Sequence, residues 1–253
     1  PFALWGTSMA AMTPLVSSGG PELVAFLRLF PAGILVLITT YLLKRDLKIY
    51  RCDLKWFVVF TIVDATFFQL FLTYGISETG AGLGSVLIDS QPLIVALLAR
   101  AIFGNLINPI GWLGLLFGLG GIIFLGFPQE FLENWWLMSD TSLGDINFNV
   151  GEAWMLAAAL SMALGTILIR LTCTKSDPVS VTGWHMVFGS LPLIFKYYLD
   201  TNFQSFPNWT FNDWGLMSFA SIFGSAIAYG LFFYFANNKE ITGFSTLAFL
   251  TPV

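Results

Sequence analysis

Long apolar stretches separated by short polar connections run through the whole chain. A helix that crosses a bilayer needs about 20 mostly apolar residues, and most of these stretches approach or reach that length. They are too long and too continuously apolar for the alternating strands of a membrane barrel. The sequence therefore predicts helices at residues 2–16, 22–43, 56–76, 83–103, 110–127, 152–171, 179–199 and 214–235, with a ninth that begins near Gly243.

The connections divide these stretches into two groups. Turn residues join neighbouring helices, as at Glu78-Thr79-Gly80 and Ser176-Asp177-Pro178. The longest connection, residues 128–150, is acidic and separates five predicted helices from the remaining four. We therefore expect a first repeat at residues 1–127, an extracytoplasmic linker at 128–150 and a truncated second repeat at 151–253. Both ends of the chain fall inside apolar stretches, so we expect missing sequence that includes a tenth helix.

Matches between the two halves support an internal repeat. Pro21, Val24 and Arg28 recur as Pro178, Val181 and His185 at an offset of 157 residues. Ser85, Leu87 and Pro92 recur as Ser245, Leu247 and Pro252 at an offset of 160 residues. A unit with an odd number of helices must repeat upside down in the membrane. The predicted fold class is an all-α transmembrane protein, a ten-helix transporter of two inverted five-helix repeats, truncated here to about nine helices.

Charged residues are scarce and unevenly placed. They make up 10% of the chain, against about 25% in soluble domains, so lipid must solvate much of the surface. Alternating topology puts nine of the eleven basic residues on one side, which the positive-inside rule names cytoplasmic. We therefore expect a multi-pass protein of the plasma (inner) membrane with a cytoplasmic N-terminus. The net charge of −4 gives no indication of a nucleic-acid partner.

The sequence gives little indication of a metal site or a nucleotide site. One histidine and two cysteines, Cys52 and Cys173, are too few for a protein-ligated zinc cluster. Both cysteines fall in predicted cytoplasmic connections, where we expect free thiols. No Walker pattern accompanies the glycines. We predict no cofactor and no metal, and the expected partners are a small-molecule substrate, the lipid bilayer, a coupling proton and a second copy in a homodimer.

Two carboxylates fall inside predicted helices. Asp64 lies in "TIVDATFF" and Asp89 in "VLIDSQPL". Because a charge at the membrane centre costs about 2.5–3.5 kcal/mol on insertion scales, neither is expected to face lipid. Each is a candidate to bind a cationic substrate group or to carry a coupling proton. The alternative is a hydrogen-bonded aspartate that holds helices together.

The residues around Asp89 add a predicted helix break. Pro92 removes one helical hydrogen bond and frees the carbonyl of Ile88 for a ligand, and Pro252 is the corresponding candidate in the ninth helix. A plain kink is the alternative. Ser85 shares a helical face with Asp89, whereas Gln91 is expected to point to a different side from Asp89 at about 100° per residue.

Arg28 and His185 are candidates for gating or ion pairing. Arg28 is either an anion-binding group or an arginine that snorkels outward or pairs with Glu22 or Glu78, and we favour the second interpretation. His185 either titrates near neutral pH or is a packing and hydrogen-bonding residue. Three aromatic residues are candidates to line a substrate path, with core or lipid contact as the favoured alternative: Trp5, Tyr74 and Tyr229.

Three segments resemble the EamA family of the drug/metabolite transporter superfamily. They are Trp5-Gly6, Ala25-Phe26-Leu27-Arg28, and the segment "QPLIVALLARAIFGNLINPIGWLGLLFGLGGIIFLG" at residues 91–126. The resemblance implies ten helices, cytoplasmic termini and movement of small metabolites, often outward. The family commonly has a Gly-Glu pair where this chain has Gly104-Asn105, so no role of that glutamate is carried over.

The predicted function is secondary-active transport, with export of small metabolites such as amino acids or amine-like compounds. The first alternative, an intramembrane enzyme, requires clustered nucleophiles and bases at one depth. The second alternative is a multi-span receptor or channel. A receptor needs no inverted repeats, and a channel shows polar or charged rings along one helix face. The sequence shows neither cluster nor rings, so we predict a transporter and not an enzyme.

Overall fold

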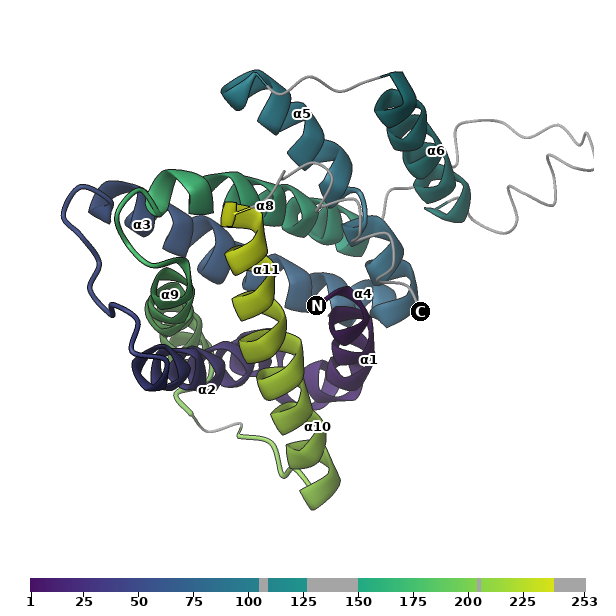
Figure 1. The fold of residues 1–253 in the computed structure, drawn as a ribbon. Helices are drawn as coiled ribbons and strands as arrows, with labels where there is room; N and C mark the ends of the chain where they lie inside the picture. Colours follow the sequence, from purple (N-terminus) through teal and green to yellow (C-terminus); the bar gives the residue numbers. More distant parts are fainter. Residues whose placement is uncertain (105–108, 127–149, 204–205, 239–253) are drawn as a thin grey trace, which may run out of the picture.

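The computed structural model describes residues 1–104, 109–126, 150–203 and 206–238, and the regular secondary structure in these ranges is helical (Figure 1). Five helical stretches among them are long and apolar enough to cross a membrane: Pro21–Leu42, Leu54–Ile88, Val150–Thr172, Pro178–Thr201 and Phe211–Asn237. The prediction of an all-helical, membrane-spanning chain is therefore confirmed. The predicted ninth helix and Pro252 lie outside the described residues.

The first two helices meet at a glycine. Helix α1 spans Phe2–Gly19 and α2 spans Pro21–Leu42. Between them Gly20 has a φ of 82°, in the left-handed region that glycine adopts without steric cost. Pro21 occupies the first turn of α2, where the amide hydrogen it lacks has no helical acceptor. A sharp corner thus returns the chain across the membrane within a few residues.

Two of the long helical rods contain an internal π-helical segment. In the first, α3 (Leu54–Phe60) continues into η1 (Thr61–Phe67) and α4 (Phe68–Ile88). In the second, α10 (Phe211–Ser221) continues into η3 (Ile222–Ile227) and α11 (Ala228–Asn238). π-Helical turns are rare and are concentrated at functional positions. The two rods therefore carry the same irregularity at corresponding places in the two halves of the chain.

The prediction of one continuous helix at residues 83–103 is wrong, because two helices cover this range. Helix α4 runs on to Ile88 after a kink at Gly80, whose φ is 74°. The chain then breaks at Asp89 and Ser90, and α5 spans Gln91–Phe103 with Pro92 in its first turn. A proline in the first turn loses no hydrogen bond, so the break precedes it. Asp89 accordingly lies at a helix end and not in mid-helix.

The remaining helices complete a bundle. Helix α6 spans Pro109–Gly126, α8 spans Val150–Thr172 and α9 spans Pro178–Thr201. Along most of their lengths α2 packs on α9 and α4 packs on α8 (Figure 1). Helices α5 and α6 lie at the edge of the bundle (Figure 1). The main core runs between α1, α8 and the rods that contain η1 and η3, and it includes Met12, Met155 and Phe232.

A polar clasp closes one end of the bundle. The Asp53 carboxylate accepts hydrogen bonds from the Thr174 hydroxyl, from the backbone N–H of Lys175 at 3.0 Å, and from the backbone N–H and hydroxyl of Ser176, both at 2.8 Å. Burial raises the pKa of this carboxyl, but the hydrogen bonds outweigh it and lower the pKa to about 2. Beside it Arg45 pairs with Asp177 at 2.8 Å. The clasp therefore joins the connection after α2 to the connection after α8.

The opposite end has a smaller ionic group. The Lys196 ammonium lies 3.0 Å from a Glu22 oxygen and 2.5 Å from an Asp200 oxygen, and the Tyr74 hydroxyl donates to Glu22. The two groups agree with the predicted sorting, in which the connections after the second and sixth helices share one side while Glu22 and Asp200 lie on the other. Cys52 and Cys173 are free thiols, as expected.

Candidate functional site

A small internal cavity brings together five of the predicted site residues. Its wall includes Trp5 from α1, Arg28 from α2, Asp89 from the α4–α5 break, Gln91 from α5 and Tyr229 from α11. Apolar side chains of α1, α4 and α8 complete the lining. The cavity has a volume of about 20 Å³, which is room for about one water molecule. Residues far apart in the sequence thus line one small space inside the bundle.

Asp89 and Gln91 line this cavity together, which corrects the expectation that they point to different sides. That expectation assumed a continuous helix, with about 100° of rotation per residue. The chain instead breaks at Asp89 and Ser90, so helical spacing does not relate the two side chains. The Gln91 amide also donates to the Thr166 hydroxyl of α8 at 3.2 Å. The break therefore turns two polar residues toward the same space.

Arg28 is the cation of the cavity. Its side chain is buried, with 1% of its surface exposed. Nε donates to Ser225 Oγ at 2.8 Å, Nη1 to Gln69 Oε1 at 3.2 Å and Nη2 to the Gly224 carbonyl at 3.2 Å. Arg28 therefore neither snorkels outward nor pairs with Glu22 or Glu78, because Glu22 is held by Lys196 and Tyr74. Its acceptors among the described residues are all uncharged.

Gln69 extends this network and is not among the residues predicted from the sequence. Its amide nitrogen donates to the Tyr229 hydroxyl at 3.0 Å while its oxygen accepts from Arg28. The Tyr229 ring lies edge-on to Trp5, with centroids 5.3 Å apart. The signal for Gln69 was present, since it is a single amide in the apolar run "TFFQLFL". A chain of contacts therefore links α1, α2, α4, η3 and α11.

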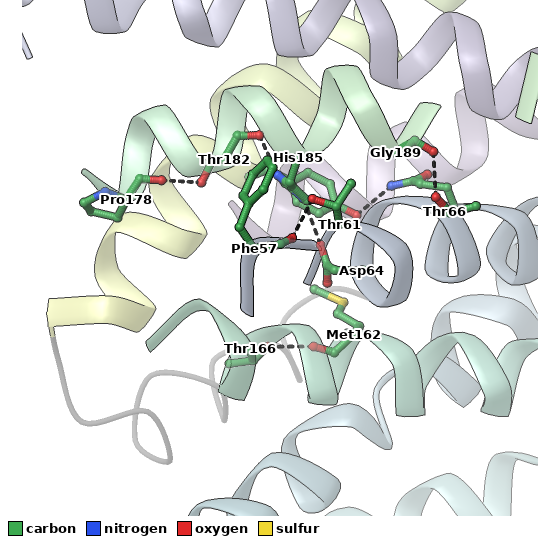
Figure 2. A network of polar contacts seen from close by, with 12 residues as sticks. Phe57, Thr61, Asp64, Thr66, Met162, Thr166, Pro178, Thr182, His185 and Gly189 are labelled. Carbon is green, nitrogen blue, oxygen red and sulfur yellow. Dashed lines mark hydrogen bonds and ion pairs between the residues drawn. The ribbon is translucent and has the colours of Figure 1, made fainter. Parts of the chain in front are cut away.

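The second candidate carboxylate, Asp64, lies in a separate polar contact with His185 (Figure 2). Both side chains are buried, with 0–1% of their surface exposed. His185 Nε2 lies 3.1 Å from Asp64 Oδ2, and Nδ1 lies 2.5 Å from the Thr182 carbonyl oxygen. Phe60 stacks on the imidazole at 4.4 Å and Phe233 meets its edge at 5.5 Å. Two aromatic rings therefore pack on the imidazole side of the pair.

The other oxygen of Asp64 has different surroundings. Oδ1 is buried and makes no hydrogen bond with the described residues. It faces the backbone of α8 at Gly165, where an added Cβ would overlap the carboxylate. Because a buried carboxylate oxygen without a donor is costly, Asp64 is poorly matched to a purely structural role.

The π segments receive equivalent contacts from opposite halves of the chain. Arg28 of α2 reaches Ser225 in η3, and His185 of α9 reaches Asp64 in η1. The same 157 residues that separate Arg28 from His185 also separate Ser8 from Gly165. Ser8 packs on Gly224 in η3, and Gly165 packs on Asp64 in η1. Two helix pairs therefore approach the two π segments in matching ways.

Some predicted site residues lie elsewhere. Ser85 is buried on α4 and donates to the Gly82 carbonyl at 2.8 Å, away from the cavity wall. Tyr74 belongs to the ionic group at one end of the bundle. Pro92 is buried in the first turn of α5. These three residues lie outside the cavity wall that contains Arg28 and Asp89.

The sequence profile of the EamA-like transporter family matches residues 2–127 and 149–253. The chain belongs to the EamA-like transporter family. An uncharacterized transporter of Synechocystis is 46% identical over 256 residues, which cover 100% of this chain and 77% of that protein. A chloroplastic WAT1-related protein of Arabidopsis thaliana is 44% identical, and the match covers 100% of this chain and 60% of that protein. The uncharacterized transporter YoaV of Bacillus subtilis is 24% identical, over 99% of this chain and 82% of its own.

A solved structure titled "Crystal structure of protein" has the same fold, with a TM-score of 0.72 at 14% identity over 99% of this chain and 82% of that one. Membership of the EamA-like family and the transporter relatives confirm the resemblance seen in the sequence. With the five apolar helical stretches, they make the chain a multi-pass integral membrane protein and a transporter. The family names are consistent with the prediction that the chain is not an enzyme.

Proposed function

We propose that this transporter is a secondary-active exporter of small zwitterionic metabolites, of which apolar amino acids are the simplest examples. One observation carries the proposal: Arg28 and Asp89 line the same internal cavity, with Trp5 and Tyr229 beside them. A guanidinium binds a carboxylate, and a carboxylate binds an ammonium group. A substrate with both groups and an apolar side chain matches this wall in charge and in polarity.

Arg28 retains the donors that such a substrate needs. A guanidinium has five N–H groups, and three nitrogen atoms each donate once to the described residues. One N–H on each terminal nitrogen is therefore left for a carboxylate. The aromatic rings of Trp5 and Tyr229 offer faces to an ammonium or apolar group. Together with the Asp89 carboxylate, these groups support a zwitterionic substrate over a substrate that carries only an amine or only an acid.

The small cavity supports alternating access. Room for about one water molecule cannot hold an amino acid, so substrate must enter after the helices have separated. The matching contacts at η1 and η3 support two inverted repeats, a five-helix repeat at residues 1–127 and a truncated one at 151–253, that rock about this point. The polar clasp between the basic connections supports a cytoplasmic N-terminus under the positive-inside rule.

The substrate class is tested with three molecules of one shape. Proteoliposomes that contain the full-length protein are loaded with radiolabelled L-leucine. Unlabelled L-leucine, isoamylamine or 4-methylpentanoate is then added as a competitor, and the efflux of labelled leucine is measured. We expect leucine to compete at least about tenfold better than either singly charged analogue, because each charge-assisted contact contributes about 1.5–3 kcal/mol. Equal competition by the amine or the acid would overturn the zwitterion proposal. Efflux of labelled leucine from liposomes without protein gives the background rate.

A further inference from the structure

The buried contact between His185 and Asp64 lies outside the cavity and is not used by the substrate contacts above. We propose that these two residues form a proton-binding site whose occupancy decides whether α9 stays joined to η1, and that this proton is the one coupled to transport. The inference rests on the proposed transport function. It assigns the coupling step to one pair of side chains.

The hydrogen-bond geometry fixes where the protons lie. The Thr182 carbonyl can only accept, so His185 Nδ1, at 2.5 Å from it, must carry hydrogen. Nε2 then faces Asp64 Oδ2 at 3.1 Å. If neither atom carried a proton, two lone pairs would face each other in a buried site. The observed contact therefore contains one proton, on either the imidazole or the carboxyl, and the pair is neutral overall.

The neighbouring helices contribute the following groups. From α8, Gly165 lies against Asp64, and the Thr166 hydroxyl is turned to the Met162 carbonyl (Figure 2). From α11, Tyr229 interacts electrostatically with Asp64 and with Arg28 of α2. Among the described residues, His185 is the basic side chain in contact with Asp64.

Loss of the shared proton breaks the contact. The proton passes to a water molecule, and a carboxylate with one negative charge is left facing the lone pair of a neutral imidazole. Both the repulsion and the buried charge are relieved when α9 moves away and water reaches Asp64. Proton binding therefore favours the closed arrangement, and proton release favours an open one.

Two variants separate proton binding from packing. In Asp64→Asn the side-chain amide can donate an N–H to His185 Nε2, so the contact persists but no longer depends on pH. In His185→Gln the imidazole is lost while a polar side chain of similar length remains. Gly215→Ala serves as a control on α10, because a Cβ there meets nothing within 4 Å.

The proton site is read directly by NMR of ¹⁵N-histidine in the full-length protein in lipid nanodiscs. The His185 signal is the one absent from His185→Gln. We expect its Nε2 shift to change between about pH 5 and pH 9 in the wild type and in Gly215→Ala, and to stay constant in Asp64→Asn. A constant signal in the wild type, or the same titration in Asp64→Asn, would overturn the proton site.

Transport then tests coupling. Wild-type proteoliposomes should move radiolabelled L-leucine faster with an imposed pH gradient, and both pair variants should lose this stimulation while Gly215→Ala keeps it. If wild-type transport ignores the pH gradient, or both variants keep the stimulation, the coupling role is wrong although transport stands. If the wild type moves neither leucine nor its analogues, the proposed function itself fails.

Discussion

The two π segments occupy matching positions but hold different chemistry. In η3, Ser225 accepts a hydrogen bond from the permanently charged Arg28 and donates to the Ala220 carbonyl. In η1, Asp64 meets the imidazole of His185 at 3.1 Å. In the proposals above, the η3 contact serves the substrate charge and is insensitive to pH, whereas the η1 contact depends on a proton. Two contacts of matching geometry would then divide substrate binding and proton binding between them.

Removing the fixed charge should have the largest effect. In Arg28→Met, an unbranched apolar side chain remains, but Gln69, Ser225 and the Gly224 carbonyl lose their donor. We expect leucine efflux to fall at least about 100-fold and stability to fall by about 4 kcal/mol, since a buried polar network is broken. Transport in proteoliposomes and thermal unfolding in detergent measure the two losses.

Arg28→Lys is the matched control for charge. Lysine keeps the positive charge but cannot reach three separated acceptors with a planar fork. Efflux should recover only in part, whereas full activity in Arg28→Lys would show that the directional contacts to η3 are dispensable. Full activity in Arg28→Met would remove Arg28 from the substrate site altogether.

The aspartate of the polar clasp sharpens the contrast with Asp64. Asp53 accepts four hydrogen bonds, and its pKa is lowered to about 2. Because the folded value lies below the ordinary value of about 3.9, the clasp contributes its full stability above about pH 4 and loses it as the pH falls toward 2. Asp53→Ala should therefore cost about 3 kcal/mol at pH 7.

Melting temperatures of wild type and Asp53→Ala between pH 7 and pH 2 check this expectation, with pH values set by that pKa window. The difference between the two proteins should stay constant near neutrality and shrink in acid. A difference that grows as the pH falls would have the wrong sign for a carboxylate held in its charged form.

Several parts of this arrangement were within reach of the sequence. Continuous apolar runs locate α2, α8 and α9 to within a few residues, because lipid contact demands unbroken apolar length. The match of Arg28 with His185 also anticipated their equivalent placement at the two π segments. Here local composition and helix order carry the information.

Other parts were out of reach for physical reasons. A π segment adds a residue to a turn without changing composition, so η1 and η3 leave no signal in the apolar pattern. The break at Asp89 sits between apolar residues that continue a helical pattern, and it overturned the predicted separation of Asp89 and Gln91. The partner of Asp64 comes from 121 residues away, and only packing brings it there.

Close approach at the two π segments gives a third test. An added Cβ at Gly165 would overlap Asp64, and one at Gly224 would overlap Ser8. Each Gly→Ala change should cost about 2 kcal/mol through overpacking, but only Gly165→Ala should alter the pH dependence of transport. Melting temperature and efflux against pH measure both outcomes.

The steric explanation is checked by rescue and by a neutral site. Ser8→Gly should restore the stability of Gly224→Ala, because it removes the overlapping atoms. Gly230→Ala, where an added Cβ meets nothing within 4 Å, should leave the melting temperature almost unchanged. Equal losses at Gly224 and Gly230 would point to helix backbone effects instead of contact.

The smallest effect should come from Ser225→Ala. This change removes one of the three acceptors of Arg28 and leaves the bonds to Gln69 and the Gly224 carbonyl. We expect a loss of about 1 kcal/mol in stability and a modest fall in leucine efflux. Because neither Ser225 nor Arg28 changes protonation near neutral pH, the shape of the pH profile should match the wild type. A shifted profile would mean that the η3 contact and the η1 contact titrate as one unit, and the proposed division of substrate binding and proton binding between the two contacts would then be wrong.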